Sequence, residues 1–314
     1  MITRPDDPRG SLRSALQKEN EAMSVLRSAL LLFFVVTFAG GAVRAQTDLT
    51  GMWSPVGGRV DNDNPPMGDF GGMPLNHADQ LRGMTFSAST FDVAEMVCRP
   101  YPPDMPFGPA QLRIWTEVDK TTQQVIAYHE HFFYHEQEYT IWTDGRPDPP
   151  DYALHTWGGF STGKWESDRL VYTTTHLKES YILPNGPARS DRATLRTHLG
   201  RYGNYLTAYT IVYDPTYLAE PYIRPASWVY DPTLRMPPYP CEEATETVVP
   251  RGVVPHHLPG RNPILTDFAA QHGIPPEAEL GGAETMYPEY IAKMKKMKLL
   301  PRPEKKTDSS GAAK

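Results

Sequence analysis

Alternation of apolar and polar residues dominates the middle of the chain. Eight segments there are rich in β-branched and aromatic residues and alternate with a period of two, which is typical of half-buried β-strands. The predicted strands are Gln111–Val118, Gln124–Phe133, Glu138–Thr143, Thr156–Glu166, Arg169–Lys178, Ala193–Arg201, Tyr205–Asp214 and Tyr222–Tyr230. Short turn-rich connections such as Ser167-Asp168 predict antiparallel neighbours. We therefore expect an all-β fold, an antiparallel meander that forms a lipocalin-like barrel or half-barrel.

The two flanks of this region lack the alternation. We expect residues 46–110, which are rich in proline and glycine, to form an irregular segment that wraps the barrel domain at 111–245. Residues 246–314 predict a proline-rich, helical extension. The short helices expected in the two flanks are Asn76–Met84, Thr90–Met96, Pro263–His272 and Pro288–Leu300. The apolar face of Pro288–Leu300 would dock on the domain or on a partner.

Residues 1–45 have the pattern of a secretory signal. Arg27 precedes the apolar run Ala29–Ala39, and small residues follow that run. The run is too short to span a bilayer. Met23 lies at a natural start for such a signal, so a mis-called extension at 1–22 stays open. We expect a periplasmic or secreted protein whose mature chain begins directly after this segment.

Net charge and cysteine content bear on the partners and on a disulfide, and they leave the expected fold unchanged. The chain carries −6, and residues 1–45 hold six basic and four acidic residues, so the remainder carries −8. We expect no nucleic-acid partner for an acidic exported protein and no membrane-spanning segment in it. Cys98 and Cys241 predict one disulfide in an oxidising compartment, with two buried free thiols as the alternative.

The densest polar cluster is a run of histidines in one predicted strand. Because residues two apart on a strand share a face, His129, His131 and His135 would point the same way. His-X-His followed by a glutamate is how cupin-type barrels hold a metal, and imidazoles suit Zn, Cu, Fe or Ni. A further ligand from a second strand, His155 or His176, would be required. The alternative is a pocket or surface with several histidines and no ion.

The predicted strand Arg169–Lys178 carries a second polar set. One of its two faces presents Tyr172, Thr174, His176 and Lys178. If this face lines the barrel, the histidines become acid/base candidates with Asp144, Glu130 or Asp191 as a carboxylate partner. If the other face lines it, His176 and Lys178 face water, and alternation alone does not decide. The predicted catalytic residues are His155, His176, Lys178 and Asp144, and the predicted ligand-binding residues are His129, His131, Tyr172, Thr174 and Trp157.

Aromatic residues make up 11% of the chain, and some must lie in the core. A small barrel lined by such rings and a few histidines would suit a hydrophobic or aromatic small ligand.

Gly159-Phe-Ser161-Thr-Gly163 has the spacing of a hydrolase nucleophile elbow, but that motif needs a helix where a strand is predicted here. Phosphate-binding and dinucleotide fingerprints are absent from the sequence.

Three functions therefore stay open. The first is an exported small-molecule-binding barrel, with or without lyase or isomerase chemistry through histidine acid/base groups. The second is a cupin-like metalloprotein, and the third is a non-catalytic envelope or interaction protein. Composition and spacing leave open whether the protein is an enzyme and whether it holds a metal.

An ordered set of motifs resembles a family of secreted bacterial proteins that opens with DL-x-G-x-W and carries a central G-[RK]-W-E-x-D-x-L-V. The matching segments are Asp48-Leu-Thr-Gly-Met-Trp53, Ile141-Trp-Thr-Asp-Gly-Arg-Pro147, Gly163-Lys-Trp-Glu166 with Asp168-Arg-Leu-Val171, Arg189-Ser-Asp191 and Tyr239-Pro-Cys-Glu242. The similarity covers most of 48–245. Ser167 and Lys164 depart from the usual Gly and Arg. The resemblance implies a secreted β-rich fold and no particular chemistry.

Overall fold

The computed structural model describes residues 47–56, 65–104, 110–133, 137–238, 249–250 and 252–302. The chain divides into two units, Met1–Gln46 and Thr47–Lys314, and the described residues all belong to the second. The predicted signal, His135 and Cys241 lie outside the described residues. The disulfide between Cys98 and Cys241 therefore stays a prediction.

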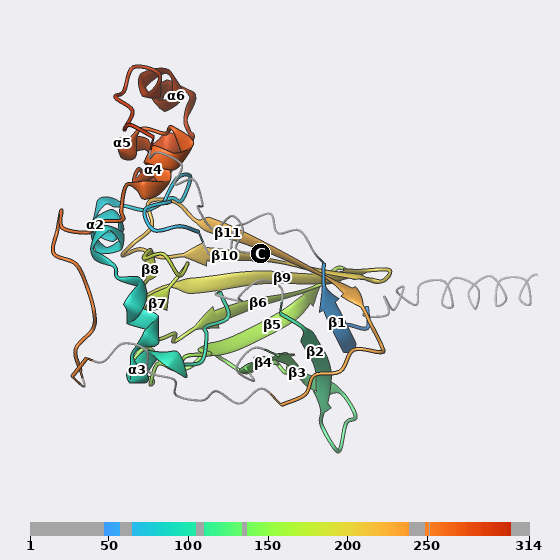
Figure 1. The fold of residues 1–314 in the computed structure, drawn as a ribbon. Coiled ribbons are helices and arrows are strands. Elements are labelled where there is room, and N and C mark those ends of the chain that lie inside the picture. The colour runs from blue at the N-terminus through green and yellow to red at the C-terminus, as the bar shows by residue number, and fades with distance from the viewer. Residues whose placement is uncertain are drawn as a thin grey trace, which may run out of the picture. The chain divides into compact units, whose positions relative to one another are not determined.

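Nine strands of the described chain form one closed barrel (Figure 1). Around the barrel their order is β1 (Gly51–Pro55), β11 (Tyr222–Tyr230), β10 (Tyr205–Tyr213), β9 (Thr194–Tyr202), β6 (Arg169–Thr175), β5 (Phe160–Glu166), β4 (Gln137–Trp142), β3 (Val125–Phe132) and β2 (Leu112–Val118), which returns to β1. A separate small sheet pairs β7 (Ser180–Tyr181) with β8 (Ala188–Arg189). The predicted all-β barrel is confirmed.

Two details of the predicted meander need correction. β4 and β5 pair in parallel, through Ile141↔Ser161 and Trp142↔Thr162, whereas the other barrel neighbours are antiparallel. In addition, β1 belongs to the barrel although its residues fall in the segment expected to wrap it.

Short helices lie between β1 and β2 and after β11 in sequence. They are α2 (His77–Thr85), η1 (Ala88–Asp92), α3 (Ala94–Val97), α4 (Asp267–His272), α5 (Pro276–Glu279), η3 (Ala283–Met286) and α6 (Pro288–Met294). Asn76 caps α2 by accepting from the Asp79 amide at 3.1 Å, and Gly273 ends α4 with φ 66°. Within the described chain, no helix is long and apolar enough to cross a bilayer. The expected helix Pro288–Leu300 is shorter, since α6 ends at Met294.

Two clusters of buried apolar residues form the core of the described part of the chain. The first surrounds Trp53, which is fully buried and donates from its indole nitrogen to Leu49 O at 3.1 Å, and it includes Leu199 and Leu206 near the β9–β10 hairpin. The second includes Leu195 and Val212 near the opposite ends of the same two strands. Between these clusters in the register of β9 and β10 lie two buried threonines, joined by a hydrogen bond of 2.9 Å. They are Thr197 and Thr210.

Candidate functional site

The parallel pairing of β4 and β5 creates the connection that builds the site. Parallel neighbours cannot be joined by a tight hairpin, so residues 143–159 form a long crossover. This crossover has no described helix and carries the run Asp148-Pro-Pro-Asp151. It must bring the chain back to the end of the barrel at which β5 begins. Because β5 and β6 are antiparallel, β6 ends there as well.

Backbone hydrogen bonds fix the crossover to the residues that follow β6. The amide of Thr156 donates to His176 O, and the amide of Lys178 donates to Thr156 O, both at 2.9 Å. Gly159 makes this approach possible. It has φ 69°, and a Cβ there would lie 2.5 Å from the carbonyl oxygen of Thr175, which no side chain tolerates.

These backbone hydrogen bonds and the close approach at Gly159 form the frame of the site. The frame brings His155 and His176 together, with ring centroids 5.3 Å apart. His155 Nδ1 lies 2.9 Å from Leu177 O, and a carbonyl only accepts, so Nδ1 carries the hydrogen. In the neutral ring, Nε2 of His155 is then the basic nitrogen. His176 instead donates from Nε2 to Pro150 O at 3.0 Å and accepts at Nδ1 from the Thr175 hydroxyl at 2.8 Å. His176 is thus held at both nitrogens.

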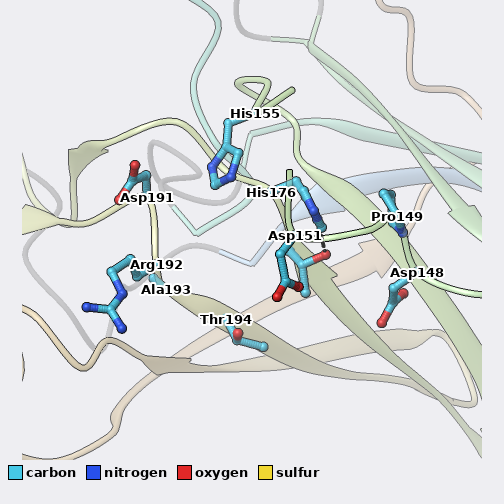
Figure 2. Close-up of a pocket in the computed structure, with 10 residues that line it drawn as sticks. Asp148, Pro149, Asp151, His155, His176, Asp191, Arg192, Ala193 and Thr194 are labelled. Carbon is cyan, nitrogen blue, oxygen red and sulfur yellow. Dashed lines mark hydrogen bonds between the residues drawn. The ribbon is translucent and has the colours of Figure 1, made fainter. Parts of the chain in front are cut away.

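Both histidines line one cavity of about 530 Å³, which we call the histidine pocket (Figure 2). Its lining residues are Asp148, Pro149, Asp151, His155, Thr175, His176, Asp191, Arg192, Ala193 and Thr194. They come from the crossover, from the end of β6 and from the start of β9 with the turn before it. In the view of Figure 2, His155 lies between Asp191 and His176. With neutral histidines, three carboxylates against one guanidinium leave the lining with a charge of −2.

The end of β6 corrects one expectation about its polar face. Tyr172 and Thr174 are buried on the side that faces the barrel interior, as one of the two predicted registers required. The strand stops at Thr175, and His176 adopts φ 55° in the left-handed region. The alternation breaks there, so the imidazole turns to Pro150 on the crossover, out of line with Tyr172 and Thr174.

Lys178 is exposed and lies outside the lining of the histidine pocket. Its Nζ is 5.1 Å from the centre of the Trp157 ring, and the Arg99 guanidinium is 4.3 Å from the same centre. Cation–π contacts of this kind stabilise the position of the ring. Lys178 and Trp157 therefore lie beside the pocket and are not among the residues that line it.

Asp144, the fourth predicted catalytic residue, lies in the turn after β4. Its carboxylate accepts from Arg146 at 2.6 to 3.1 Å, and these hydrogen bonds hold the pKa of the Asp144 carboxyl below its ordinary value. It is not among the residues that line the pocket. Of the carboxylates proposed as histidine partners, Asp191 is the one that shares the pocket with both histidines.

A second polar region, the interior layer, lies inside the barrel. It consists of Glu130, Tyr172, Thr174, Ser161, Thr197 and Thr210, all at most 9% exposed. The Tyr172 hydroxyl is 3.4 and 3.5 Å from the two oxygens of Glu130, and Ser161 and Thr174 share a hydrogen bond of 2.8 Å. Burial raises the pKa of Glu130 to about 7, although the hydrogen bond from Tyr172 opposes the rise.

The histidines of β3 point away from this interior. His129 stacks on Trp115 with centroids 5.1 Å apart, and it contacts Glu117 at 3.2 Å and the Thr140 hydroxyl at 3.1 Å. His131 shares this face and is partly exposed. Among the residues that the structure describes, no group of three or more His, Cys, Asp or Glu side chains is placed to hold a metal ion. With His135 outside the described residues, the metal site stays a prediction without support from geometry.

Sequence reasoning missed seven of the ten lining residues, namely Asp148, Pro149, Asp151, Thr175, Arg192, Ala193 and Thr194. One signal for most of them was present. The two longest gaps between predicted strands, 144–155 and 179–192, both end in pocket residues. Long connections on a rigid scaffold are where sites are commonly built.

Comparison of the chain with protein-family models, with curated proteins and with solved structures found no match. The site is therefore interpreted from its own geometry.

Proposed function

We propose that this barrel is an exported small-molecule-binding protein whose ligand occupies the histidine pocket. A β-barrel is consistent with small-molecule binding. The observation that carries the choice of pocket is the fixed state of His155. Its Nδ1 is committed to a backbone carbonyl, so its basic Nε2 is available in a cavity that three carboxylates share.

The lining favours a ligand with an amine or several hydroxyl groups. An excess of carboxylates attracts a cation and accepts hydrogen bonds from hydroxyls, whereas it repels an anion. Tyr152 and Leu154 are each 90% exposed and lie between the pocket residues Asp151 and His155 in sequence. They are available to cover an apolar portion of the ligand. The hydrophobic or aromatic part of the ligand that the sequence led us to expect would thus contact Tyr152 and Leu154.

The chemistry we propose is proton transfer through His155, as in a lyase or an isomerase. Nε2 of His155 accepts a proton from a C–H or O–H group of the ligand, and the carboxylates of the pocket stabilise the imidazolium that results. The proton then returns to another ligand atom in an isomerase, or to the leaving group in a lyase. His176 is a positioning residue, since both of its nitrogens are already hydrogen-bonded.

A matched pair of probes tests the binding proposal. Tyramine and 4-hydroxyphenylacetate share a phenol and differ in carrying an amine or a carboxylate. Calorimetric titration is expected to detect tyramine binding alone, and His155→Ala should weaken it about tenfold, as for loss of a well-made polar contact. Asp144→Asn, outside the pocket, is the control and should bind normally. Preference for the acid, absence of binding by both probes, or equal affinity in His155→Ala would refute the proposal.

Export is part of the same proposal. The signal pattern ends at residue 45, and the compact unit begins at Thr47. The resemblance to secreted bacterial proteins supports the same compartment. Mass spectrometry of the exported chain, before and after reduction, tests whether Cys98 and Cys241 are joined, as we expect in an oxidising compartment.

A further inference from the structure

A second surface, separate from the histidine pocket, lies near the C-terminus. We call Met286–Arg302 the basic segment; it comprises the end of η3, then α6 and the residues that follow it. It holds five basic residues and one acidic residue, a net charge of +4. Since the whole chain carries −6, everything outside the segment carries −10. The positive charge is therefore local on a strongly acidic protein.

Apolar side chains lie exposed among these charges. Met286 is 65% exposed, Ile291 45% and Leu299 52%. A single exposed apolar residue is ordinary on a protein surface. Here Met286 and Ile291 precede and Leu299 follows a group of four exposed lysines, which are Lys293, Lys295, Lys296 and Lys298.

The tyrosines of the segment attach it to the rest of the compact unit. The Tyr287 hydroxyl donates to the Glu220 carboxylate, and the Tyr290 hydroxyl donates to Glu277 O at 2.9 Å. Glu220 follows the barrel strand β10 in sequence, and Glu277 belongs to α5. The segment is thus anchored by polar contacts, and Met286, Ile291 and Leu299 stay exposed.

We propose that the basic segment docks on a membrane surface that contains anionic lipid. The ammonium groups would contact lipid phosphates while Met286, Ile291 and Leu299 enter the headgroup–acyl boundary, which is how lysine-rich amphipathic segments lie on membranes. Nucleic acid is disfavoured because exposed aliphatic chains add nothing to phosphate binding. The acidic remainder of the chain would be repelled, so the docked protein would present this segment first.

Vesicle co-sedimentation of the unit that begins at Thr47 tests the proposal, because this choice removes the apolar run 29–39, which would bind vesicles by itself. Binding is expected to vesicles of phosphatidylcholine mixed with phosphatidylglycerol and not to phosphatidylcholine alone. It should disappear at high salt, since the Debye length shrinks from about 10 Å at 0.1 M to about 3 Å at 1 M. No binding to either vesicle, or equal binding to both, would overturn the proposal. An acidic protein partner would give the first of these results.

Paired variants separate local from overall charge. Lys293→Gln with Lys296→Gln should lower vesicle binding on the order of 25-fold, about fivefold for each lysine. Ile291→Ser with Leu299→Ser should lower it roughly tenfold through lost apolar insertion. The control, Lys120→Gln with Lys164→Gln, removes the same charge from exposed positions on the barrel and should bind normally. Equal losses in the control pair would show that only net charge matters and refute the assignment. Unchanged tyramine binding in all variants confirms that they remain folded.

Discussion

β6 separates two polar regions that differ in almost every physical respect. Thr174 points into the interior layer, and the next residue, Thr175, lines the histidine pocket. In the interior layer a sealed carboxyl, Glu130, has one distant hydroxyl partner and a raised pKa. In the pocket two half-buried histidines are held by backbone carbonyls close to solvated carboxylates. The comparison teaches that burial of Glu130 changes its pKa and makes the stability of the fold depend on pH. In the histidine pocket, backbone hydrogen bonds at the surface instead fix the orientation of His155 and His176 toward a ligand.

The largest expected effect comes from breaking the frame of the pocket. Gly159→Ala places a Cβ against the Thr175 carbonyl at a positive φ, so unfolding free energy in urea should fall by about 4 kcal/mol, and tyramine binding should be lost. Gly145→Ala is the matched control. Its φ is 80°, but a Cβ there meets nothing within 4 Å, so its cost should be only about 1 kcal/mol. Similar costs at the two glycines would contradict the close approach.

The interior layer should make stability depend on pH. Glu130 has a folded pKa of about 7 against an ordinary 4.5, so the folded state holds its proton more tightly than the unfolded state. Stability from this group is full below pH 4.5 and is lost as pH rises to about 7, a change on the order of 3 kcal/mol. Urea unfolding between pH 4 and pH 8 should show a fall of which Glu130 contributes about 3 kcal/mol.

Glu130→Gln should remove that part of the pH dependence and leave tyramine binding unchanged. Asp79 and Glu279, whose pKa values burial also raises to about 7, will retain a smaller slope. A slope as steep as in the parent protein would contradict the assignment to Glu130. Altered tyramine binding would show that the two regions are coupled.

The smallest expected effect on stability concerns His176, which follows the end of β6. His176 has φ 55°, a conformation that glycine adopts freely and alanine does not. His176→Gly should therefore be about 1 kcal/mol more stable than His176→Ala in chemical denaturation. Both variants lose the hydrogen bond to Pro150 O and should weaken tyramine binding equally. Equal stability of the two variants would show that the left-handed backbone costs nothing.

Most strand positions were predictable because alternation is a local property of the sequence. The predicted Arg169–Lys178 and the observed Arg169–Thr175 differ only where His176 leaves the strand. The turn at Ser167-Asp168 was predicted too, and Ser167 has φ 59° there, which explains why glycine would fit that turn.

What sequence could not supply was pairing between distant segments and the orientation of single side chains. The parallel contact of β4 with β5 depends on tertiary packing, and it decides that the crossover with Asp148 and Asp151 forms a wall of the pocket. The pair His155 and His176 was predicted as residues but not as a surface site. Their position follows from one left-handed residue and from Gly159, neither of which has a periodic signature.

The place of β1 has a consequence for the order of folding. Trp53 pairs with Leu112 on one side and with Tyr230 on the other, so the first strand of the barrel closes it against the last. During synthesis β1 emerges first and must wait unpaired on one edge until β11 follows. Loop-closure entropy then makes this contact slow to form. Until Tyr230 has emerged, the chain carries two open strand edges that can pair with another molecule.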